Sequence, residues 1–389
     1  MRRSSWWLAV GLVCSASFAA TAQDTTFARN QASIQGIVVM ETPAGMIGQA
    51  IDIIATVTPG DKKQTRFERA VGEDMTTSLV EAVRAVQLQH REWDGTQVRM
   101  SFEDKYTAKD GGSAGTAYAV ALRSLLEGFE IDPGYAMTGD ITVDLRVRKI
   151  GGVAAKIKGA TKDGATIVGI PAENLDAVED LVVMESPQAL LDTQVFALET
   201  LDEAVALART DRNEDLDTAI KQFDALRDLL GPRGIAAIRT PEAEALLVEI
   251  VATAPHHTSA DLLLRHVYRE GPQQLSVTGS LVAILDIGRP AFSIMNNARP
   301  GRVSMEDRQR MSEIKRQLSG LRSKVHPDTR EFRNAFNAYV SAGTALVKAR
   351  AVNNKLVQRY NKSIDTLVKS YAALGEDQDV LEAMMRGSY

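Results

Sequence analysis

The segment Lys109-Asp110-Gly111-Gly112-Ser113-Ala114-Gly115 places a serine among glycines, at the start of an alanine-rich stretch that is predicted to be helical. A second segment, Ile150-Gly151-Gly152-Val153-Ala154-Ala155-Lys156, begins a predicted helix with two glycines and then carries a lysine. Between them lies Ala136-Met137-Thr138-Gly139-Asp140-Ile141-Thr142. A serine, a threonine and a lysine in this order suggest hydrolysis by a hydroxyl nucleophile without a histidine base.

Predicted strands and helices alternate around these segments. Runs rich in β-branched residues predict strands over 33–40, 49–58, 98–102, 141–147 and 166–170. Apolar residues at three- and four-residue spacing predict helices over 72–89 and 113–126, and further helices are expected to start near 152 and after 171. This alternation predicts an α/β or α+β domain in the first half of the chain.

The second half is helical in pattern almost throughout. Candidate helices lie near 188–209, 214–229, 241–254, 258–270, 276–288, 305–324 and 329–372, with a short tail helix after them. Prolines at 232, 272, 290 and 300 mark the expected breaks. Aromatic and leucine residues from Phe336 to Tyr371 form a helical stripe, which favours a packed bundle; an exposed helix for oligomerisation or for a partner is the alternative.

The first 22 residues have the pattern of a secretory signal. Arg2 and Arg3 precede an apolar run over 6–18, and Ala20-Thr21-Ala22 is a small-residue cleavage site, so cleavage is expected after Ala22. The adjacent arginines leave a twin-arginine signal open. No later segment offers about 18 uninterrupted apolar residues. We therefore expect a soluble, exported protein, in the periplasm rather than the medium.

Charge and cysteine content exclude several classes of function. Without the signal the 389-residue chain keeps 43 basic and 50 acidic side chains, a net charge of −7, which disfavours nucleic acid or an anionic membrane as the main partner. The single cysteine, Cys14, lies in the signal, so the mature chain would have no thiol nucleophile, disulfide or Cys-based zinc site. His256, His257 and His266 lack a carboxylate at ligand spacing, and no metal or cofactor is expected.

Ser113 has the surroundings that a hydroxyl nucleophile needs. Glycines allow close approach of a carbonyl, and a helix beginning near Ala114 would offer free N–H groups to an oxyanion. The alternative is a plain serine N-cap after a glycine turn.

Lys156 could act as a base only if its amine were neutral. Lowering a lysine pKa from about 10.4 to about 7–8 requires roughly 3–5 kcal/mol of differential stabilisation, which desolvation usually supplies. The residues Val153, Ala154, Ala155 and Ile157 give this lysine small, apolar neighbours in sequence. An ordinary solvated surface lysine is the alternative, and only the combination with Ser113 makes the catalytic interpretation competitive.

The ordered motifs resemble the proteolytic domain of the Lon protease family. Five of them keep the family's order and spacing: Gly72-Glu73-Asp74-Met75, the segment around Ser113, the segment around Thr138, the Gly-Gly segment before Lys156, and Ile170-Pro171-Ala172-Glu173-Asn174. The resemblance is nearly ungapped over 98–174 and looser over about 33–186. It implies an α+β Lon-type proteolytic domain over 23–187. The helical pattern of the second half predicts that an all-α helical domain, a bundle or an array, follows over 188–389.

The resemblance also implies the roles of individual residues. Ser113 would be the nucleophile and Lys156 the base of a Ser-Lys dyad, with the Thr138 hydroxyl orienting the lysine. Asp110 occupies a position where the family usually has an acid, and we assign it to loop geometry. The backbone near Gly112, Ser113 and Ala114 would supply oxyanion donors, while Gly151 and Gly152 shape the loop before the lysine.

Several positions depart from the family pattern. Gly112 stands where the family usually has proline, which implies a more mobile nucleophile loop. Arg99 and Ser101 replace histidines that are common on the preceding strand, and Val153-Ala154-Ala155 replaces the usual Leu-Lys-Glu. These changes leave the dyad intact.

Lon proteases are usually fused to an ATP-driven unfoldase, but this sequence has no Gly-x4-Gly-Lys-Ser/Thr phosphate loop. We therefore expect an ATP-independent serine endopeptidase that cleaves peptides or unfolded proteins, and family resemblance suggests a homo-oligomer. The alternative is a catalytically silent binding or scaffold protein with a Lon-like fold.

Overall fold

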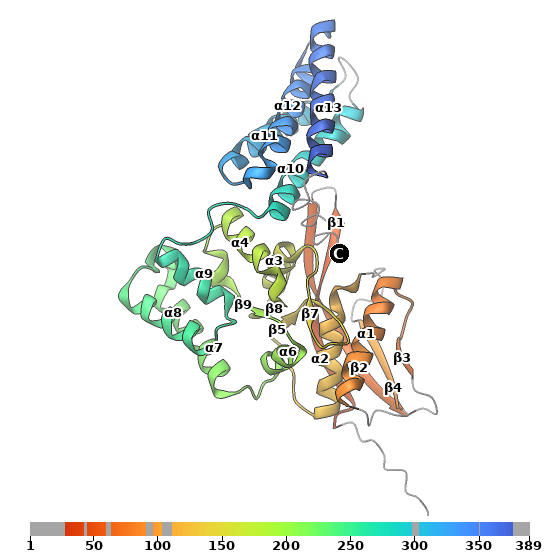
Figure 1. Ribbon diagram of the computed structural model, residues 1–389, viewed down its shortest axis with the longest axis vertical. Helices are drawn as coiled ribbons and strands as arrows, with labels where there is room; N and C mark the ends of the chain where they lie inside the picture. Colours follow the sequence, from red (N-terminus) through yellow and green to blue (C-terminus); the bar gives the residue numbers. More distant parts are fainter. Residues whose placement is uncertain are drawn as a thin grey trace, which may run out of the picture.

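The computed structural model describes residues 28–42, 45–59, 64–90, 96–102, 111–297, 303–349 and 351–375. A mixed sheet is covered by helices on both faces, and a group of C-terminal helices projects beyond it (Figure 1). This arrangement confirms the expected α+β domain followed by an all-α region. The expected signal sequence and tail helix lie outside the described residues.

Seven strands of the described chain form one sheet in the order β3-β4-β2-β1-β5-β8-β9. Their bounds are β1 Gln31–Thr42, β2 Gly45–Pro59, β3 Gln64–Phe67, β4 Thr96–Phe102, β5 Tyr135–Met137, β8 Ile167–Pro171 and β9 Gln194–Leu198. β1 and β2 form a long antiparallel hairpin with Ile34 opposite Ile53, whereas β1, β5, β8 and β9 run parallel. All five residues of β8 are buried, as expected for a parallel strand covered on both faces.

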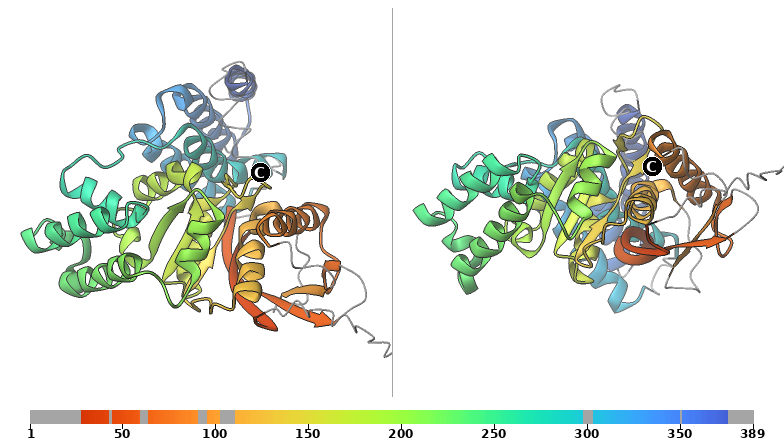
Figure 2. Two further views of the ribbon diagram at one scale, coloured as in Figure 1. Left: turned by 60° about the horizontal axis from the view of Figure 1, so that its bottom comes forward. Right: turned by 90° about the horizontal axis from the view of Figure 1, so that it is seen from below.

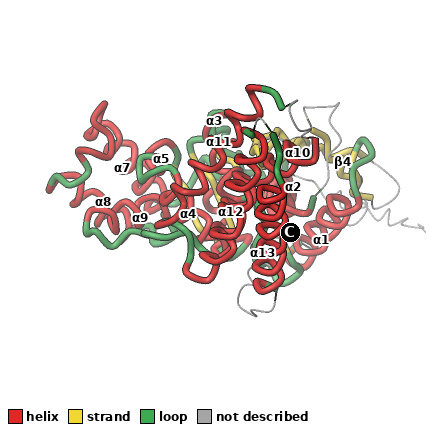
Figure 3. Tube along the Cα trace, turned by 90° about the horizontal axis from the view of Figure 1, so that it is seen from above, coloured by secondary structure: helices red, strands yellow, loops and turns green. Residues whose placement is uncertain are grey.

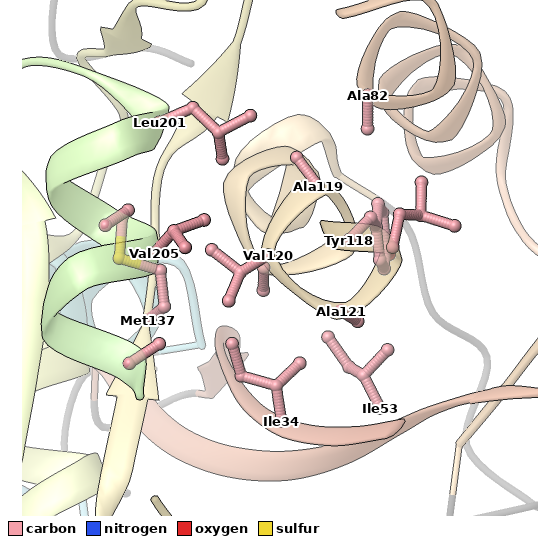
Figure 4. Close-up of a cluster of buried hydrophobic side chains, with 14 of the residues drawn as sticks. Ile34, Ile53, Ala82, Tyr118, Ala119, Val120, Ala121, Met137, Leu201 and Val205 are labelled. Carbon is pink, nitrogen blue, oxygen red and sulfur yellow. The ribbon is translucent and has the colours of Figure 1, made fainter. Parts of the chain in front are cut away.

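One face of the sheet is covered by α1 (Glu73–Gln89), α2 (Gly115–Glu127) and α6 (Leu201–Ala208). Figure 4 shows α2 at the centre of this layer, with Tyr118, Val120 and Ala121 between the strands and neighbouring helices. The alanines of α2 are completely buried, and their small size allows close packing on all sides. The helix that follows Ser113 is therefore held in the core.

The other face is covered by α3 (Val153–Lys162), α4 (Leu175–Met184), α5 (Ala189–Asp192), α7 (Glu214–Leu230), α8 (Pro241–Thr253) and α9 (Thr258–Val267). The parallel strands β1, β5, β8 and β9 send residues into both cores: in β9, Val195 contributes to this one, and Phe196 to the other. Figure 2 shows α7–α9 in green at the opposite end of the molecule from α1, and Figure 3 shows the same separation from above.

The last four helices of the described chain have a core of their own. They are α10 (Val277–Asn297), α11 (Met305–Gly320), α12 (Arg330–Lys348) and α13 (Asn354–Leu374). In α12, the ring of Phe336 makes edge-to-face contacts with the rings of Phe332 and Tyr339. The Tyr339 hydroxyl accepts a hydrogen bond from Tyr360 of α13 at 3.2 Å. The aromatic stripe thus packs between helices, as the bundle interpretation predicts.

Among the described residues, α10 alone is long and apolar enough to cross a membrane, judged by length and composition. Its buried side chains Leu281, Ile284 and Ala291 lie in the core of the four-helix bundle. In the window of α10 that meets this test, 33% of the residues are buried.

Polar contacts join the four-helix bundle to α4. The Ser276 N–H and hydroxyl both donate to the Asp180 carboxylate, at 2.6 and 2.7 Å, just before α10 begins. The Lys324 amine donates to the carbonyl of Val183 at 2.8 Å, near the end of α4. Burial raises the pKa of Asp180 to about 6, and the Ser276 hydrogen bonds partly oppose this shift.

Some expected elements are wrong. The strand expected over 141–147 is a small ladder of β6 (Asp140–Ile141) and β7 (Val147–Arg148), because the chain turns at Leu145, which has a positive φ of 66°. The strand β5 was not predicted. The expected helix over 329–372 is divided into α12 and α13, while α10 continues through Pro290, where a break was expected, because residues on both sides of Pro290 are buried in one core.

The helix expected over 188–209 contains a strand instead. β9 pairs in parallel with β8 along its whole length and closes this edge of the sheet beyond the boundary expected at 187/188. The helices α7–α9 then share a core with α3 and α4. By core membership, the separate helical part begins at α10.

Candidate active site

Ser113 lies in a short 3-10 turn, Gly112–Ala114, that leads directly into α2. Gly111 has a φ of 115°, a conformation that favours glycine, and it turns the chain into the helix. Ser113 is partly exposed, whereas Ala114 is buried. This position places a partly exposed serine at the N-terminus of a helix held in the core.

The carbonyl of Ser113 is held by two donors from the loop after β5. The Gly139 N–H donates to it at 2.8 Å, and the Thr138 hydroxyl lies 3.1 Å away. Thr138 is completely buried, and its hydroxyl also lies 3.4 Å from the carbonyl of Ile37 in β1. Thr138 therefore anchors the nucleophile's own backbone.

Lys156 is a buried lysine on α3, with 1% of its surface exposed. Burial lowers the pKa of its amine from 10.5 to about 7. No carboxylate in the described part of the chain forms an ion pair with it, so desolvation acts unopposed. At neutral pH a large fraction of this amine is uncharged, as a general base requires.

Close backbone packing holds α3 in place. Gly48 of β2 lies against this helix, where an added Cβ would be 2.1 Å from the Ala155 carbonyl oxygen and 2.7 Å from Lys156 Cα. Gly159, one turn further along α3, faces Gly48 in the same way. The helix begins after Gly152, whose φ of 70° is a left-handed conformation. The apolar residues next to Lys156 thus belong to a fixed contact with the sheet.

The loop before α3 is clamped by Asn174. Its side-chain oxygen accepts from the Ile150 N–H, and its amide group donates to the Ile150 carbonyl, both at 3.0 Å. Asn174 is buried and fixes the turn that carries Gly151 and Gly152. It closes the last of the five motifs, but no role was predicted for it.

The structure brings the elements that carry Ser113 and Lys156 to one strand. Both the Ser113 turn and α3 pack against β1, and Thr138 bonds to the backbones of β1 and of Ser113. Within the described residues the Lys156 amine has no hydrogen bond to Ser113 or Thr138. Catalytic hydrogen bonds are often long without substrate. Asp110 lies outside the described residues.

Two polar residues near the nucleophile turn were not predicted to belong to the site. Ser78 of α1 donates to the Gly112 carbonyl at 2.8 Å, and Asp140 lies 3.3 Å from the same hydroxyl. Ser78 is a polar residue on the buried face of an amphipathic helix, between Met75 and Leu79 in the core. A hydroxyl at such a position is the sequence signal that could have identified it.

Of the three histidines named above, His257 has a structural role. His257 is completely buried, its Nδ1 accepts from the Ala260 N–H as the N-cap of α9, and its Nε2 lies 3.1 Å from Gln194. Burial lowers its pKa to about 3, so the ring is neutral. Among the described residues no group of three His, Cys, Asp or Glu side chains could hold a metal ion.

A pocket of about 660 Å³ lies between α3, α4, α10 and the start of β2. Its walls are mainly apolar and include Val153, Leu181 and Val282, while Ser113 and Lys156 do not line it. Of the residues predicted for the site, Gly151 and Gly152 line the pocket.

Comparison with known proteins identifies the same part of the chain. The family model of the Lon protease (S16) C-terminal proteolytic domain matches residues 25–210. An archaeal Lon protease from Archaeoglobus fulgidus is 32% identical over 149 residues, which cover 37% of this chain and 24% of the relative. A Lon protease from Methylocella silvestris is 33% identical over 175 residues, 43% of this chain and 21% of the relative.

This chain thus matches only about a quarter or less of the length of these relatives. The match takes in the Ser113 turn, the Thr138 loop and α3, and it continues through β9 and α6. In its ordered motifs and in its match to the family model, the part of the chain over residues 25–210 is similar to the proteolytic domain of the Lon protease family.

Proposed function

We propose that this protein is a serine endopeptidase of Lon type in which Ser113 is the nucleophile and Lys156 the general base. The observation that carries the proposal is the buried amine of Lys156, whose pKa is lowered to about 7 in an apolar contact between α3 and the sheet. A lysine buried at this energetic cost, without an ion-pair partner in the described chain, is typical of a functional group.

In the proposed mechanism, the neutral Lys156 amine takes the proton of the Ser113 hydroxyl as its oxygen attacks the scissile carbonyl. Backbone N–H groups of the turn at the start of α2 stabilise the oxyanion. The ammonium then returns the proton to the leaving amine, and the acyl-enzyme is hydrolysed by water that the same lysine activates. Thr138 and Gly139 hold the Ser113 carbonyl throughout.

We also propose the class of substrate, the cellular location and the oligomeric state. Peptides and unfolded proteins are the proposed substrates, cleaved without ATP, because the sequence has no phosphate-loop motif. The signal-like first 22 residues support export, and we propose the periplasm as the location. A homo-oligomer is proposed from the family alone. The rival, a silent scaffold, is disfavoured by the buried Lys156.

The test is degradation of unfolded casein and of a peptide library by the mature protein, with and without ATP. Ser113→Ala and Lys156→Ala should each abolish cleavage, and Lys158→Ala is the matched control because Lys158 is an exposed lysine on the same helix. Equal cleavage by wild type and by both site variants would overturn the proposal. Fractionation of cells that produce the full chain tests the location.

A further inference from the structure

A side chain of α1, which the sequence motifs did not indicate, binds the peptide group between Gly112 and Ser113. The Gly112 carbonyl accepts a hydrogen bond from the Ser78 hydroxyl at 2.8 Å and another from the Gly115 N–H. In a trans peptide the carbonyl and the following N–H point in opposite directions. A donor that fixes the Gly112 carbonyl therefore also fixes the direction of the Ser113 N–H.

The next peptide bond is fixed in the same way. The Ser113 carbonyl accepts from the Gly139 N–H and the Thr138 hydroxyl, and this sets the direction of the Ala114 N–H. Both N–H groups lie in the first turn at the start of α2, where helical N–H groups have no partner from an earlier turn. We infer that these two N–H groups, whose peptide bonds are held in this way, are the oxyanion donors near Ser113.

Asp140 holds Ser78 in place. Its Oδ1 accepts from the Ile141 N–H at 2.8 Å and lies 3.3 Å from the Ser78 hydroxyl. An added Cβ on Gly115 would be 2.6 Å from Ser78 Oγ and 2.8 Å from Asp140 Oδ1, so both side chains press against the backbone of the nucleophile turn. Burial raises the pKa of Asp140, while hydrogen bonds from Ile141 and Ser78 oppose that change.

We propose that Ser78 and Asp140 are positioning residues that orient the Ser113 N–H toward the oxyanion of the transition state. The inference rests on the proposed peptidase function. Neither residue touches the substrate; they act through the peptide bond between Gly112 and Ser113. Since an oxyanion exists only in the transition state, loss of this orientation lowers kcat and leaves substrate binding nearly unchanged.

The test compares Ser78→Ala, Asp140→Ala and Asp140→Asn in peptide cleavage. Removal of one oxyanion donor typically costs about 100- to 1,000-fold in kcat, and loss of its orientation should cost about 10- to 100-fold. We expect that loss for Ser78→Ala and Asp140→Ala, with KM within about twofold. Asp140→Asn keeps the accepting oxygen and should restore most of the rate. Thr77→Ala, which removes an exposed hydroxyl from the same helix, should match wild type.

The affinity for a peptide boronate, which forms a tetrahedral adduct with the serine, is a second measurement. If Ser78 and Asp140 only supported the fold, their replacement would not weaken boronate binding while leaving KM unchanged. It should weaken in parallel with kcat, while circular dichroism and KM stay constant. Wild-type kcat and boronate affinity in Ser78→Ala would overturn the inference and leave the proposed function intact. An inactive wild-type protein that binds no boronate would instead contradict the proposed function itself.

Discussion

Replacement of Lys156 by methionine should make the protein more stable while abolishing its activity. Burial lowers the pKa of this amine from 10.5 to about 7, and each pKa unit corresponds to about 1.4 kcal/mol. The folded state therefore disfavours the charged form by about 5 kcal/mol. Methionine has similar length and no charge, so it removes that cost without a large cavity.

The sign of the pH dependence follows from the lowered pKa. In the unfolded chain Lys156 binds a proton below about pH 10.5, and in the folded chain only below about pH 7. Its contribution to stability is complete above about pH 10.5 and is lost as the pH falls to about 7. At pH 7 we expect Lys156→Met to raise the free energy of unfolding by about 2–5 kcal/mol, and by less at pH 9.5.

Urea denaturation followed by circular dichroism at pH 7 and pH 9.5 measures both effects. Lys158→Met is the matched control: Lys158 is exposed and paired with Glu185, so its loss should change stability by less than about 1 kcal/mol. Destabilisation of Lys156→Met at both pH values, as for a truncated core side chain, would refute the account of a buried, desolvated amine.

Two further predictions concern contacts around α3 and α4. Gly48→Ala should lower the free energy of unfolding by about 1–3 kcal/mol and reduce kcat, because the new Cβ displaces the helix that carries Lys156. Denaturation followed by circular dichroism measures the stability, and peptide cleavage measures kcat. An unchanged kcat would contradict the prediction. The Asp180 pKa of about 6 lies above its unfolded value of 3.8, so its contribution to docking of α10 is present below about pH 4 and is lost as the pH rises through about 6. In a catalytically inactive variant, the rate of trypsin cleavage at Arg269, divided by the rate for an unstructured peptide, should therefore increase from pH 5 to pH 7. Asp180→Asn should remove that increase. The same pH dependence of the cleavage rate with Asp180 and with Asp180→Asn would contradict this prediction.

Much of the proteolytic domain could be predicted because its local signals agree with its tertiary structure. The β-branched runs that became β1 and β2 and the amphipathic α1 have clear periodicity, and the glycines before Ser113 and Lys156 lie where the backbone requires them. The low pKa of Lys156 was also anticipated, since its sequence neighbours are small and apolar.

Elements that depend on distant partners could not be predicted in this way. β9 is a short apolar run that could be helix or strand, and only its pairing with β8 decides between them. The contacts of Ser78 with Gly112 and of Asn174 with Ile150 join residues far apart in sequence. α10 passes Pro290 because of its packing, which local propensity does not include.

The central claim is that a neutral Lys156 activates Ser113, and covalent labelling tests it most directly. The mature protein is treated with a fluorophosphonate from pH 5 to pH 9, and the adduct is located by peptide mass spectrometry. With a pKa of about 7, the labelling rate at Ser113 should rise about tenfold from pH 6 to pH 8, and Lys156→Met should remove the rise. An adduct on another serine, or a rate at Ser113 that is the same in wild type and Lys156→Met, would contradict the account.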